Sequence, residues 1–265
     1  MTTGSRSRAR SFGSAAARYA AHRPSYPAAL FDTVEELAGF PLAGARVADV
    51  GAGTGIASAL LHARGARVVA VEPGEGMAAE FSRRNPGIAL VRGDGDRLPL
   101  ATAGLDLLAY AQSWHWTDPA LAGPEALRVL RPWGALAVWS NDPDTDVEWI
   151  AAQQARIEKR FGPGWYVNEP ARSLPGLEFT TRRLRWSRLI PVEAHLAKLS
   201  THSLFLVGEP GTDAFLADER DRLGALFPDG LLREHYTVRL GVAVRRQGPD
   251  GTAKGPGLRE EAGAL

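Results

Sequence analysis

The residues best placed for chemistry lie in Val47-Ala-Asp-Val-Gly-Ala-Gly-Thr-Gly55, where three glycines at alternate positions follow an acid. Glycine allows a sharp reversal between a strand and a helix and lets the backbone approach a ligand. A dinucleotide site has the pattern Gly-x-Gly-x-x-Gly and binds a pyrophosphate at the helix amino terminus. Here Ile56 replaces the third glycine of that pattern. Asp49 would repel a pyrophosphate but could accept hydrogen bonds from an ammonium group, although an acid here could also be a simple turn residue.

A second acid ends the next apolar run, Arg67-Val-Val-Ala-Val-Glu72. An acid about 20 residues after a glycine turn accepts hydrogen bonds from ribose hydroxyls in nucleotide-binding folds. A ligand that combines a ribose and an ammonium group without a phosphate is S-adenosylmethionine. The two acids therefore predict S-adenosylmethionine as the cofactor.

Five stretches of the chain, in order, resemble the class I S-adenosylmethionine-dependent methyltransferases, in the branch that includes trans-aconitate methyltransferase-like and quinone-biosynthesis enzymes. These stretches are 49–55, 71–77, 93–99, 111–116 and 128–134, within a resemblance that covers residues 12–140. One departure is Trp133, where the family usually has a glycine before Gly134. We expect that turn to lie away from the cofactor.

The resemblance implies a role for several residues around the cofactor. Glu72 would bind the ribose, Asp94 would accept from the adenine amino group, and Gly95 would lie beside the adenine ring. Met77 would pack on the adenine, although it could equally be a core methionine, and Asp94 could be a solvated loop acid like Asp96. The predicted cofactor-binding residues are Arg23, Asp49, Gly51, Gly53, Thr54, Gly55, Glu72, Pro73, Met77, Asp94, Gly95, Ala111 and Gln112.

The acceptor is expected beside Gln112-Ser-Trp-His-Trp116, because ligands of open parallel sheets lie at the carboxyl ends of the strands. His115 could take the proton from an acceptor hydroxyl. It could also merely shape the pocket between two tryptophans, and a carboxylate acceptor would need no base. The candidate catalytic residues are His115 and Tyr19.

The elbow Tyr19-Ala-Ala-His-Arg-Pro-Ser-Tyr26 resembles the amino-terminal lid of the family. Arg23 could pair with the carboxylate of the cofactor, and either tyrosine could close the pocket or belong to an ordinary surface helix. Single residues from the later half are more often core or surface residues than substrate contacts. The candidate substrate-binding residues are Tyr26, Trp114, Trp116, Trp165, Tyr166, Arg172, His202 and Ser203.

Apolar strands that alternate with helices predict an α/β fold with a parallel sheet covered on both faces. Two later strands, 180–189 and 237–245, are expected to form an antiparallel pair at one edge. The resemblance implies a Rossmann-like, seven-stranded, doubly wound sheet whose last strand is antiparallel. We expect one methyltransferase domain over 12–247, with an N-terminal helical lid (12–40), acceptor-side elements (144–178 and 190–230) and disordered tails (1–11 and 248–265).

Composition limits the other function classes. A formal net charge of +1 offers no phosphate track, so we expect no nucleic-acid partner. The absence of cysteine and of a long apolar run favours a cytoplasmic protein with no membrane partner. We expect a monomer or a homodimer, although the sequence does not specify the oligomeric state. No metal is predicted, because the six histidines form no ligand-spaced pair. Asp142-Pro-Asp-Thr-Asp146 lacks the glycine of a calcium loop and is interpreted as helix capping.

The sequence therefore predicts S-adenosylmethionine-dependent methyl transfer to a small organic molecule, with O-methylation of a carboxylate or hydroxyl as the first expectation. C-methylation of a small carbon nucleophile is the alternative reaction. A protein that binds the cofactor without methylating is a further alternative. A nicotinamide-dependent oxidoreductase is disfavoured by Asp49 and Ile56.

Overall fold

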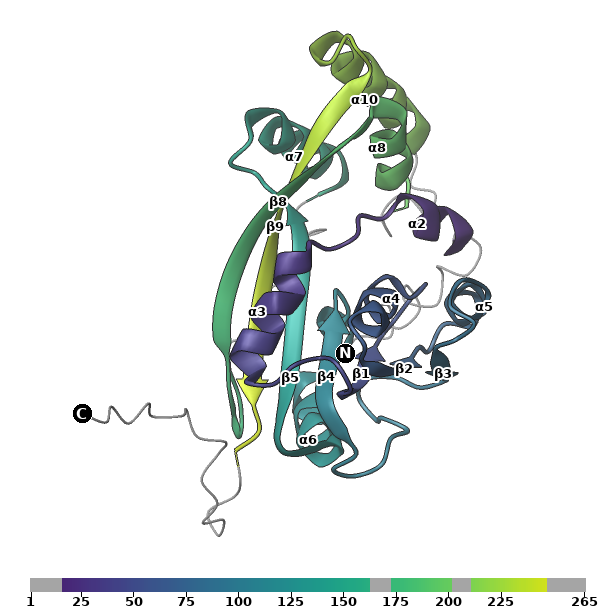
Figure 1. The fold of residues 1–265 in the computed structure, drawn as a ribbon. Helices are drawn as coiled ribbons and strands as arrows, with labels where there is room; N and C mark the ends of the chain where they lie inside the picture. The colour runs from purple at the N-terminus through teal and green to yellow at the C-terminus, as the bar shows by residue number, and fades with distance from the viewer. Residues whose placement is uncertain (1–15, 163–172, 202–210, 247–265) are drawn as a thin grey trace, which may run out of the picture.

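A seven-stranded mixed sheet carries the fold in the computed structural model, which describes residues 16–162, 173–201 and 211–246 (Figure 1). The strands are β1 (Arg46–Val50), β2 (Arg67–Val71), β3 (Ala89–Val91), β4 (Leu105–Ala111), β5 (Leu130–Pro143), β8 (Thr180–Pro191) and β9 (Leu231–Val244). Their order is β3-β2-β1-β4-β5-β9-β8. The first five strands are parallel, and β9 is antiparallel to both β5 and β8. The predicted fold class, including the antiparallel last strand, is confirmed.

Helices cover both sides of this sheet. They are α2 (Ala16–His22), α3 (Ala28–Ala38), α4 (Ile56–Ala63), α5 (Glu75–Arg84), the 3-10 turn η2 (Trp114–Trp116), α6 (Pro119–Val129), α7 (Glu148–Phe161), α8 (Val192–Leu199) and α10 (Thr212–Leu226). A short hairpin of β6 (Ser173–Leu174) and β7 (Leu177–Glu178) forms a separate two-stranded sheet, and its leucines pack in the core of the main sheet. The central strands read as nearly continuous apolar runs because both of their faces are buried.

Each face of the sheet has its own apolar core. On one face, Leu30, Phe31 and Val34 of α3 are buried in the same cluster as Trp139 and Leu240. On the other face, the small residues of α6 lie in one cluster with Tyr110 and Leu136. The two cores fix the carboxyl ends of β1, β2 and β4, where the glycine turn and the predicted site begin.

The strands β5 and β9 are longer than the sequence predicted. The alternation predicted the later strand over 237–245, but the ladder between β5 and β9 extends to the pair Pro143 and Tyr236. The extra residues were not recognised because polar side chains occupy inward positions: Asn141 and Glu234 are both buried. Tertiary hydrogen bonds compensate these buried polar groups, which a local apolar pattern does not reveal.

The long β8–β9 pair extends past the rest of the sheet and carries α7, α8 and α10, a group of elements that we call the cap (Figure 1). The cap has a third apolar cluster, which includes Ile157, Leu196, Leu223 and Leu232. The cap corresponds to the regions 144–178 and 190–230 that we predicted on the acceptor side. Whether it contacts an acceptor stays a prediction.

The N-terminal region predicted as a lid contains helix α2, which contacts α5 and α8, and its role as a lid stays a prediction. The elbow continues beyond α2 into residues 23–26, which form neither helix nor strand. Its backbone accepts two side-chain hydrogen bonds, from Arg188 Nη2 to the His22 carbonyl (3.4 Å) and from Asn141 Nδ2 to the Ser25 carbonyl (3.5 Å). The elbow is thus tied to both β5 and β8.

The interpretation of residues 142–146 as a helix cap is wrong. Helix α7 has Val147 at its N-cap position, without a side-chain hydrogen bond. Asp144 instead accepts from the amide of Asp146 (3.2 Å), and Asp142 accepts from the hydroxyl of Ser140 (2.8 Å). Both acids therefore accept hydrogen bonds at the end of β5, because that strand continues as far as Pro143.

Candidate functional site

The glycine turn between β1 and α4 requires glycine for conformational and steric reasons. Gly51, Gly53 and Gly55 have φ angles of 67°, 58° and 90°, a region that other residues rarely adopt. A Cβ at Gly51 would come within 2.5 Å of the Ser113 side chain, and one at Gly55 within 2.4 Å of Asn85. A Cβ at Gly53 would meet nothing within 4 Å. Gly51 and Gly55 therefore allow close packing, whereas Gly53 faces open space.

Asp49 lies at the core of this turn with unused hydrogen-bonding capacity. Its side chain is 0 % exposed, and Oδ2 accepts a hydrogen bond from the Ser58 hydroxyl at 2.6 Å. Its Oδ1 has no hydrogen-bond partner among the described residues. Burial raises the pKa of Asp49 to about 6, with a smaller contribution in the same direction from Glu72. A buried carboxylate with an unpaired oxygen fits a cationic donor, because such an oxygen is costly to leave without a partner.

Glu72, at the end of β2, holds the turn from the other side. Its two carboxylate oxygens accept hydrogen bonds from the backbone amides of Gly53 (2.8 Å) and Gly74 (2.7 Å). Burial raises the pKa of Glu72, against the effect of these amides. Each carboxylate oxygen has a second lone pair, so Glu72 can hold the turn and still accept from a ligand hydroxyl.

The unpartnered hydroxyl of Thr54 lies in the wall of a recess between α4 and α5. The Thr54 side chain is 2 % exposed, and within the described part of the chain its Oγ1 has no hydrogen-bond partner. The recess holds ≈ 500 Å³ of empty space, including the part open to solvent. Residues Arg83, Arg84 and Asn85 at the end of α5 form its opposite wall. Thr54 thus offers a hydroxyl beside the glycine turn.

The loop after β3 is built around Asp94 and Gly95. Asp94 is exposed, and its Oδ1 accepts from the amides of Asp96 and Arg97, both at 3.1 Å. Gly95 is buried where a Cβ would lie 2.7 Å from Thr117, so a side chain does not fit there. The loop conformation is therefore explained without a ligand, and the adenine role of Asp94 stays a prediction.

Two further predicted residues lie at the start of α5. Met77 is buried on the inner side of that helix. Pro73 is half-buried, and its carbonyl accepts from Arg92 Nη2 at 2.6 Å. Burial of Met77 agrees equally with a core role and with packing on an adenine ring.

The end of β4 brings Ala111 and Gln112 beside the glycine turn. Gln112 has a φ of 58°, and its amide donates to the Trp139 carbonyl of β5 at 2.8 Å. A strained residue of this kind persists when its surroundings hold it, and such residues gather at functional sites. The Ser113 hydroxyl links this loop to β1 by donating a hydrogen bond to the Val50 carbonyl.

The aromatic residues of η2 point in different directions. Trp114 is buried and packs edge-on against Tyr110, with ring centroids 4.8 Å apart. His115 is exposed, and its ring lies 4.5 Å from that of the half-buried Trp116. His115 is therefore not held between two tryptophans. A role of His115 in proton transfer stays a prediction, and the buried Trp114 packs under the loop against Tyr110.

The elbow brings two predicted residues near the sheet. Arg23 Nη2 donates to the Thr201 carbonyl at the end of α8 (3.4 Å). Tyr26 packs edge-on against Trp139, with ring centroids 5.9 Å apart. The backbone of Tyr19 lies in α2, but its side chain is outside the described part of the structure. Trp165, Tyr166, Arg172, His202 and Ser203 also lie outside the described residues.

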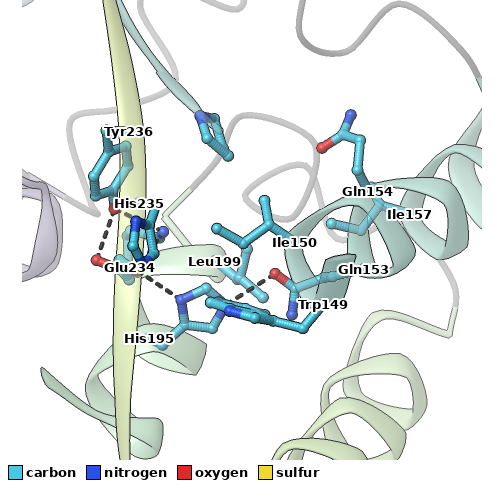
Figure 2. A pocket seen from close by; sticks show the side chains of 12 residues that line it. Trp149, Ile150, Gln153, Gln154, Ile157, His195, Leu199, Glu234, His235 and Tyr236 are labelled. Carbon is cyan, nitrogen blue, oxygen red and sulfur yellow. Dashed lines mark hydrogen bonds and ion pairs between the residues drawn. The ribbon is translucent and has the colours of Figure 1, made fainter. Parts of the chain in front are cut away.

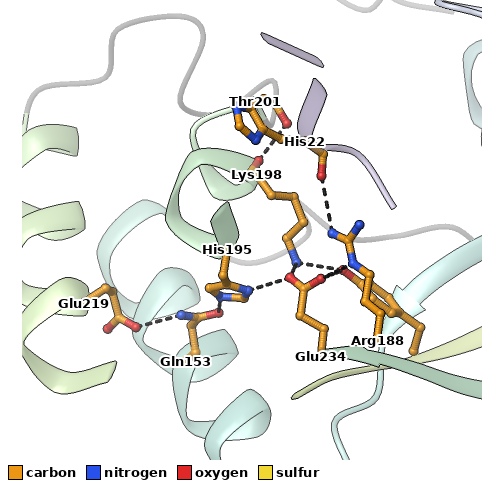
Figure 3. Close-up of polar contacts among 9 residues, drawn as sticks. His22, Gln153, Arg188, His195, Lys198, Thr201, Glu219 and Glu234 are labelled. Carbon is orange, nitrogen blue, oxygen red and sulfur yellow. Dashed lines mark hydrogen bonds and ion pairs between the residues drawn. The ribbon is translucent and has the colours of Figure 1, made fainter. Parts of the chain in front are cut away.

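Sequence reasoning missed a buried ion cluster in the cap (Figure 3). Glu234 accepts from His195 Nδ1 (2.6 Å), Lys198 Nζ (2.5 Å), Arg188 Nε (2.7 Å) and the hydroxyl of Tyr236 (2.7 Å). The only sequence signal was a glutamate at an inward position of a strand, with a lysine and a histidine three residues apart on α8. Such a pattern is common on solvated surfaces, so it did not stand out.

The charges of this cluster depend on one another. Burial alone would raise the pKa of Glu234, but Lys198, His195 and Arg188 together hold it well below its ordinary value. Burial, followed by the neighbouring Lys198, lowers the pKa of His195 to about 4. Burial also lowers the pKa of Lys198, against the opposing effect of Glu234.

Metal sites and membrane-spanning helices are both absent from the residues that the structure describes. No cluster of three His, Asp or Glu side chains there could hold a metal ion. None of the helices in the same residues combines the length and the apolar character needed to cross a membrane.

Comparisons with known proteins cover the part of the chain that contains the glycine turn. A family model described as a methyltransferase domain matches residues 48–138. An uncharacterized methyltransferase of Mycobacterium tuberculosis is 40% identical over 150 residues, which are 57% of this chain and 60% of that relative. The chain thus spans about three fifths of the mycobacterial relatives.

Two further matches extend the comparison. The demethylmenaquinone methyltransferase of Clavibacter sepedonicus is 30% identical over 168 residues, which cover 58% of this chain and 69% of that protein. A solved structure from Anaeromyxobacter dehalogenans, described as a candidate type II methyltransferase, has a TM-score of 0.61 and 25% identity over 84% of this chain and 97% of its own. With its sheet order and its glycine turn, the chain belongs to the class I S-adenosylmethionine-dependent methyltransferases.

Proposed function

We propose that the protein transfers a methyl group from S-adenosylmethionine to a small organic molecule, at an oxygen of a carboxylate or hydroxyl. The observation that carries the proposal is the buried Oδ1 of Asp49 behind the three left-handed glycines, which has no partner in the part of the chain that the structure describes. Its negative charge suits the ammonium group of S-adenosylmethionine and disfavours a diphosphate. The family to which the chain belongs supports the same cofactor.

The residues at the strand ends would hold the cofactor. When bound, S-adenosylmethionine supplies a methyl group on a positively charged sulfur. Asp49 would accept from its ammonium group, and Glu72 would accept from its ribose hydroxyls while keeping the Gly53 amide in place. The remaining predicted contacts are those of Arg23, Thr54, Pro73, Met77, Asp94, Gly95, Ala111 and Gln112. Orientation and exclusion of water would supply most of the rate.

The acceptor side is supported by the exposed imidazole of His115 beyond the end of β4. This imidazole could take a proton from an acceptor hydroxyl, whereas a carboxylate acceptor would need no base. Tyr26 and Trp116 would border the acceptor. We further propose that the protein acts in the cytoplasm, as a monomer or homodimer, without a nucleic-acid or membrane partner.

Substitution of the two acids tests the proposal. Asp49→Ala and Glu72→Ala should each weaken binding of S-adenosylhomocysteine by about 10- to 100-fold, because a charged hydrogen bond contributes roughly 1.5–3 kcal/mol. Isothermal titration measures this, with Glu193→Ala, an exposed acid of the cap, as the control. Titration of both variants like the parent protein would show that the assigned pocket is wrong.

A radiolabelled assay tests turnover separately from binding. The protein would be incubated with methyl-labelled S-adenosylmethionine and a panel of small acids, phenols and quinols. Label that enters product as an ester or ether supports oxygen methylation, and label on carbon contradicts it. Tight cofactor binding without labelled product in any fraction contradicts an enzymatic function. His115→Ala should leave cofactor affinity nearly intact and slow the reaction of hydroxyl acceptors alone.

A further inference from the structure

Two side chains of the sheet donate hydrogen bonds to the backbone of the elbow. Asn141 of β5 is 1 % exposed, and its Nδ2 donates to the Ser25 carbonyl at 3.5 Å. Arg188 of β8 donates from Nη2 to the His22 carbonyl at 3.4 Å (Figure 3). Because both acceptors are backbone carbonyls, these contacts fix the path of the chain through the elbow.

The elbow depends on outside donors because of its own sequence. Residues 23–26 form neither helix nor strand, and Pro24 has no backbone N–H. His22 is the last residue of α2, so its carbonyl lies beyond the hydrogen bonds within that helix. Carbonyl groups in such a segment need donors from elsewhere in the fold. Asn141 and Arg188 supply two of them.

The orientation of the Asn141 amide is set by Trp186. The Trp186 indole Nε1 donates to Asn141 Oδ1 at 2.9 Å. An indole N–H can only donate, so the amide oxygen faces Trp186 and the amide nitrogen is left for the elbow. The Trp186 ring is itself stacked on Tyr236, with ring centroids 5.0 Å apart. Asn141 therefore meets the Ser25 carbonyl with its donor already oriented.

The orientation of Arg188 is set by the ion cluster of the cap. Its Nε donates to Glu234 Oε2 at 2.7 Å, and the same oxygen accepts from the Tyr236 hydroxyl at 2.7 Å. Figure 2 shows Glu234 between Tyr236 and His195, whose Nδ1 lies 2.6 Å from Glu234 Oε1. A buried carboxylate held in this way has little freedom to turn. The guanidinium of Arg188 is thus held with Nη2 toward the elbow.

The contacts with the elbow are longer than the contacts that orient the two donors. The orienting contacts measure 2.7 and 2.9 Å, which is usual for hydrogen bonds from nitrogen to oxygen. The contacts with the carbonyls of His22 and Ser25 measure 3.4 and 3.5 Å, at the long end of the range. The donors therefore keep their places without the elbow, and the elbow can leave them and return readily.

The elbow is placed to act on the candidate cofactor site. Tyr26 packs edge-on against Trp139, whose carbonyl receives the Gln112 amide at the end of β4. At the other end of the elbow, α2 contacts both α8 and α5, the helix that carries Met77 (Figure 1). A shift of the elbow would therefore move Arg23 and Tyr26 relative to the strand ends that bound the site.

From these contacts we propose that Asn141 and Arg188 are positioning residues, which hold the elbow over the cofactor by bonds weak enough to release it when the cofactor is exchanged. The inference rests on the proposed function, because it assigns the elbow to the cofactor bound at the strand ends. Neither residue would touch the reacting atoms, and no covalent bond changes.

Hydrogen exchange measured by mass spectrometry on the cofactor-free protein tests the position of the elbow. Asn141→Leu removes one donor, Arg188→Met removes the other, and Trp186→Phe removes the N–H that orients Asn141. In each variant, the amides of residues 19–26 should exchange about 2- to 10-fold faster than in the parent, which is the range expected for one lost hydrogen bond. The amides of α4 should keep the parent rate, because only the elbow is released.

Two matched variants serve as controls. Ser140→Ala removes a buried hydrogen bond from the neighbour of Asn141, whose side chain points to the opposite face of the sheet. Arg182→Met removes an exposed arginine of β8. Neither should change exchange at residues 19–26. Circular dichroism checks folding, and Trp186→Phe tests the Asn141 contact if Asn141→Leu does not fold. Unchanged exchange at the elbow in the folded variants would overturn the inference.

Titration with S-adenosylhomocysteine separates this inference from the proposed function. The same three variants should bind it about 2- to 10-fold more weakly than the parent. Faster exchange at the elbow with unchanged affinity would overturn the positioning role and leave the proposed function intact. Failure of the parent protein to bind S-adenosylhomocysteine would refute the proposed function, whereas the exchange measurement, made without cofactor, would still show whether the two donors hold the elbow.

Discussion

Asp49 in the glycine turn and Glu234 in the cap are both buried carboxylates, but their surroundings are opposite. Asp49 has the Ser58 hydroxyl on one oxygen and no partner among the described residues on the other. Glu234 has four donors, two of which are cationic side chains. Burial raises the pKa of Asp49 to about 6, whereas the cations hold the pKa of Glu234 well below its ordinary value.

The difference separates two ways in which a fold can keep a buried carboxylate. The glycine turn has unused negative charge and so suits a cation, such as the ammonium group of the cofactor. The cap instead surrounds its buried carboxylate with cationic side chains of the protein itself. Asp49 is also costly to the folded protein, because a buried ionised group lacks compensation, whereas Glu234 is needed to hold Lys198 and Arg188.

The largest loss of stability is expected when the cap loses the negative charge of Glu234. Glu234→Gln leaves Lys198 and Arg188 without their shared carboxylate, which should destabilise the protein by about 3–5 kcal/mol. Urea unfolding followed by circular dichroism gives the free energy of unfolding. Glu193→Gln, which removes the carboxylate of an exposed ion pair, should change it by less than about 1 kcal/mol. Equal effects of the two substitutions would mean that the cap cluster is no more than a surface network.

Substitution of Asp49 should have the opposite effect on the free energy of unfolding and stabilise the protein at neutral pH. Its folded-state pKa of about 6 lies above the unfolded value near 4, so the folded protein binds this proton more tightly. Protonation of Asp49 thus contributes roughly 3 kcal/mol to the free energy of unfolding. This contribution is fully present below about pH 4 and is lost as the pH rises through about 6. Asp49→Asn should therefore match the parent at low pH and exceed its stability at pH 7.

Urea unfolding of the cofactor-free protein between about pH 4 and pH 7 measures this difference. The comparison of parent and Asp49→Asn cancels the other groups that titrate in this range. If the two stability curves run parallel, Asp49 is solvated in solution and the contrast with Glu234 disappears.

The smallest effect is expected at Trp133, which has a φ of 64° where the family usually has a glycine. A residue other than glycine is strained in this region. In Trp133→Gly, relief of this strain offsets the loss of a half-buried ring, so the free energy of unfolding should change by no more than about 1 kcal/mol. Affinity for S-adenosylhomocysteine, measured by titration, should stay the same. Weaker binding would show that this turn communicates with the cofactor site.

The sequence predicted the sheet and the glycine turn because both depend on local patterns. The runs at 46–50 and 67–71 are apolar on both faces, and Gly51, Gly53 and Gly55 stand where the backbone needs left-handed φ angles. The contact of Glu72 with the Gly53 amide was not predicted, because the sequence analysis assigned that carboxylate to the ribose alone.

The cap cluster could not be predicted in the same way. Its members come from α7, α8, β8 and β9, and Gln153 and Glu234 are far apart in the sequence although both bind His195. Glu234 even concealed the first half of β9, because an inward-facing charge interrupts the apolar alternation by which strands are recognised. Similarly, burial of Trp114 against Tyr110 depends on how η2 folds after β4, which the sequence pattern does not specify.

The central claim is that the unpaired oxygen of Asp49 selects a cationic group. Calorimetric titration of the parent and Asp49→Asn proteins with S-adenosylhomocysteine, and with its analogue lacking the amino group, tests this claim most directly. The parent should prefer the amino compound by about 10- to 100-fold, and Asp49→Asn should bind both compounds with nearly equal affinity. An undiminished preference in Asp49→Asn would contradict the account, because the ammonium group would then be recognised elsewhere.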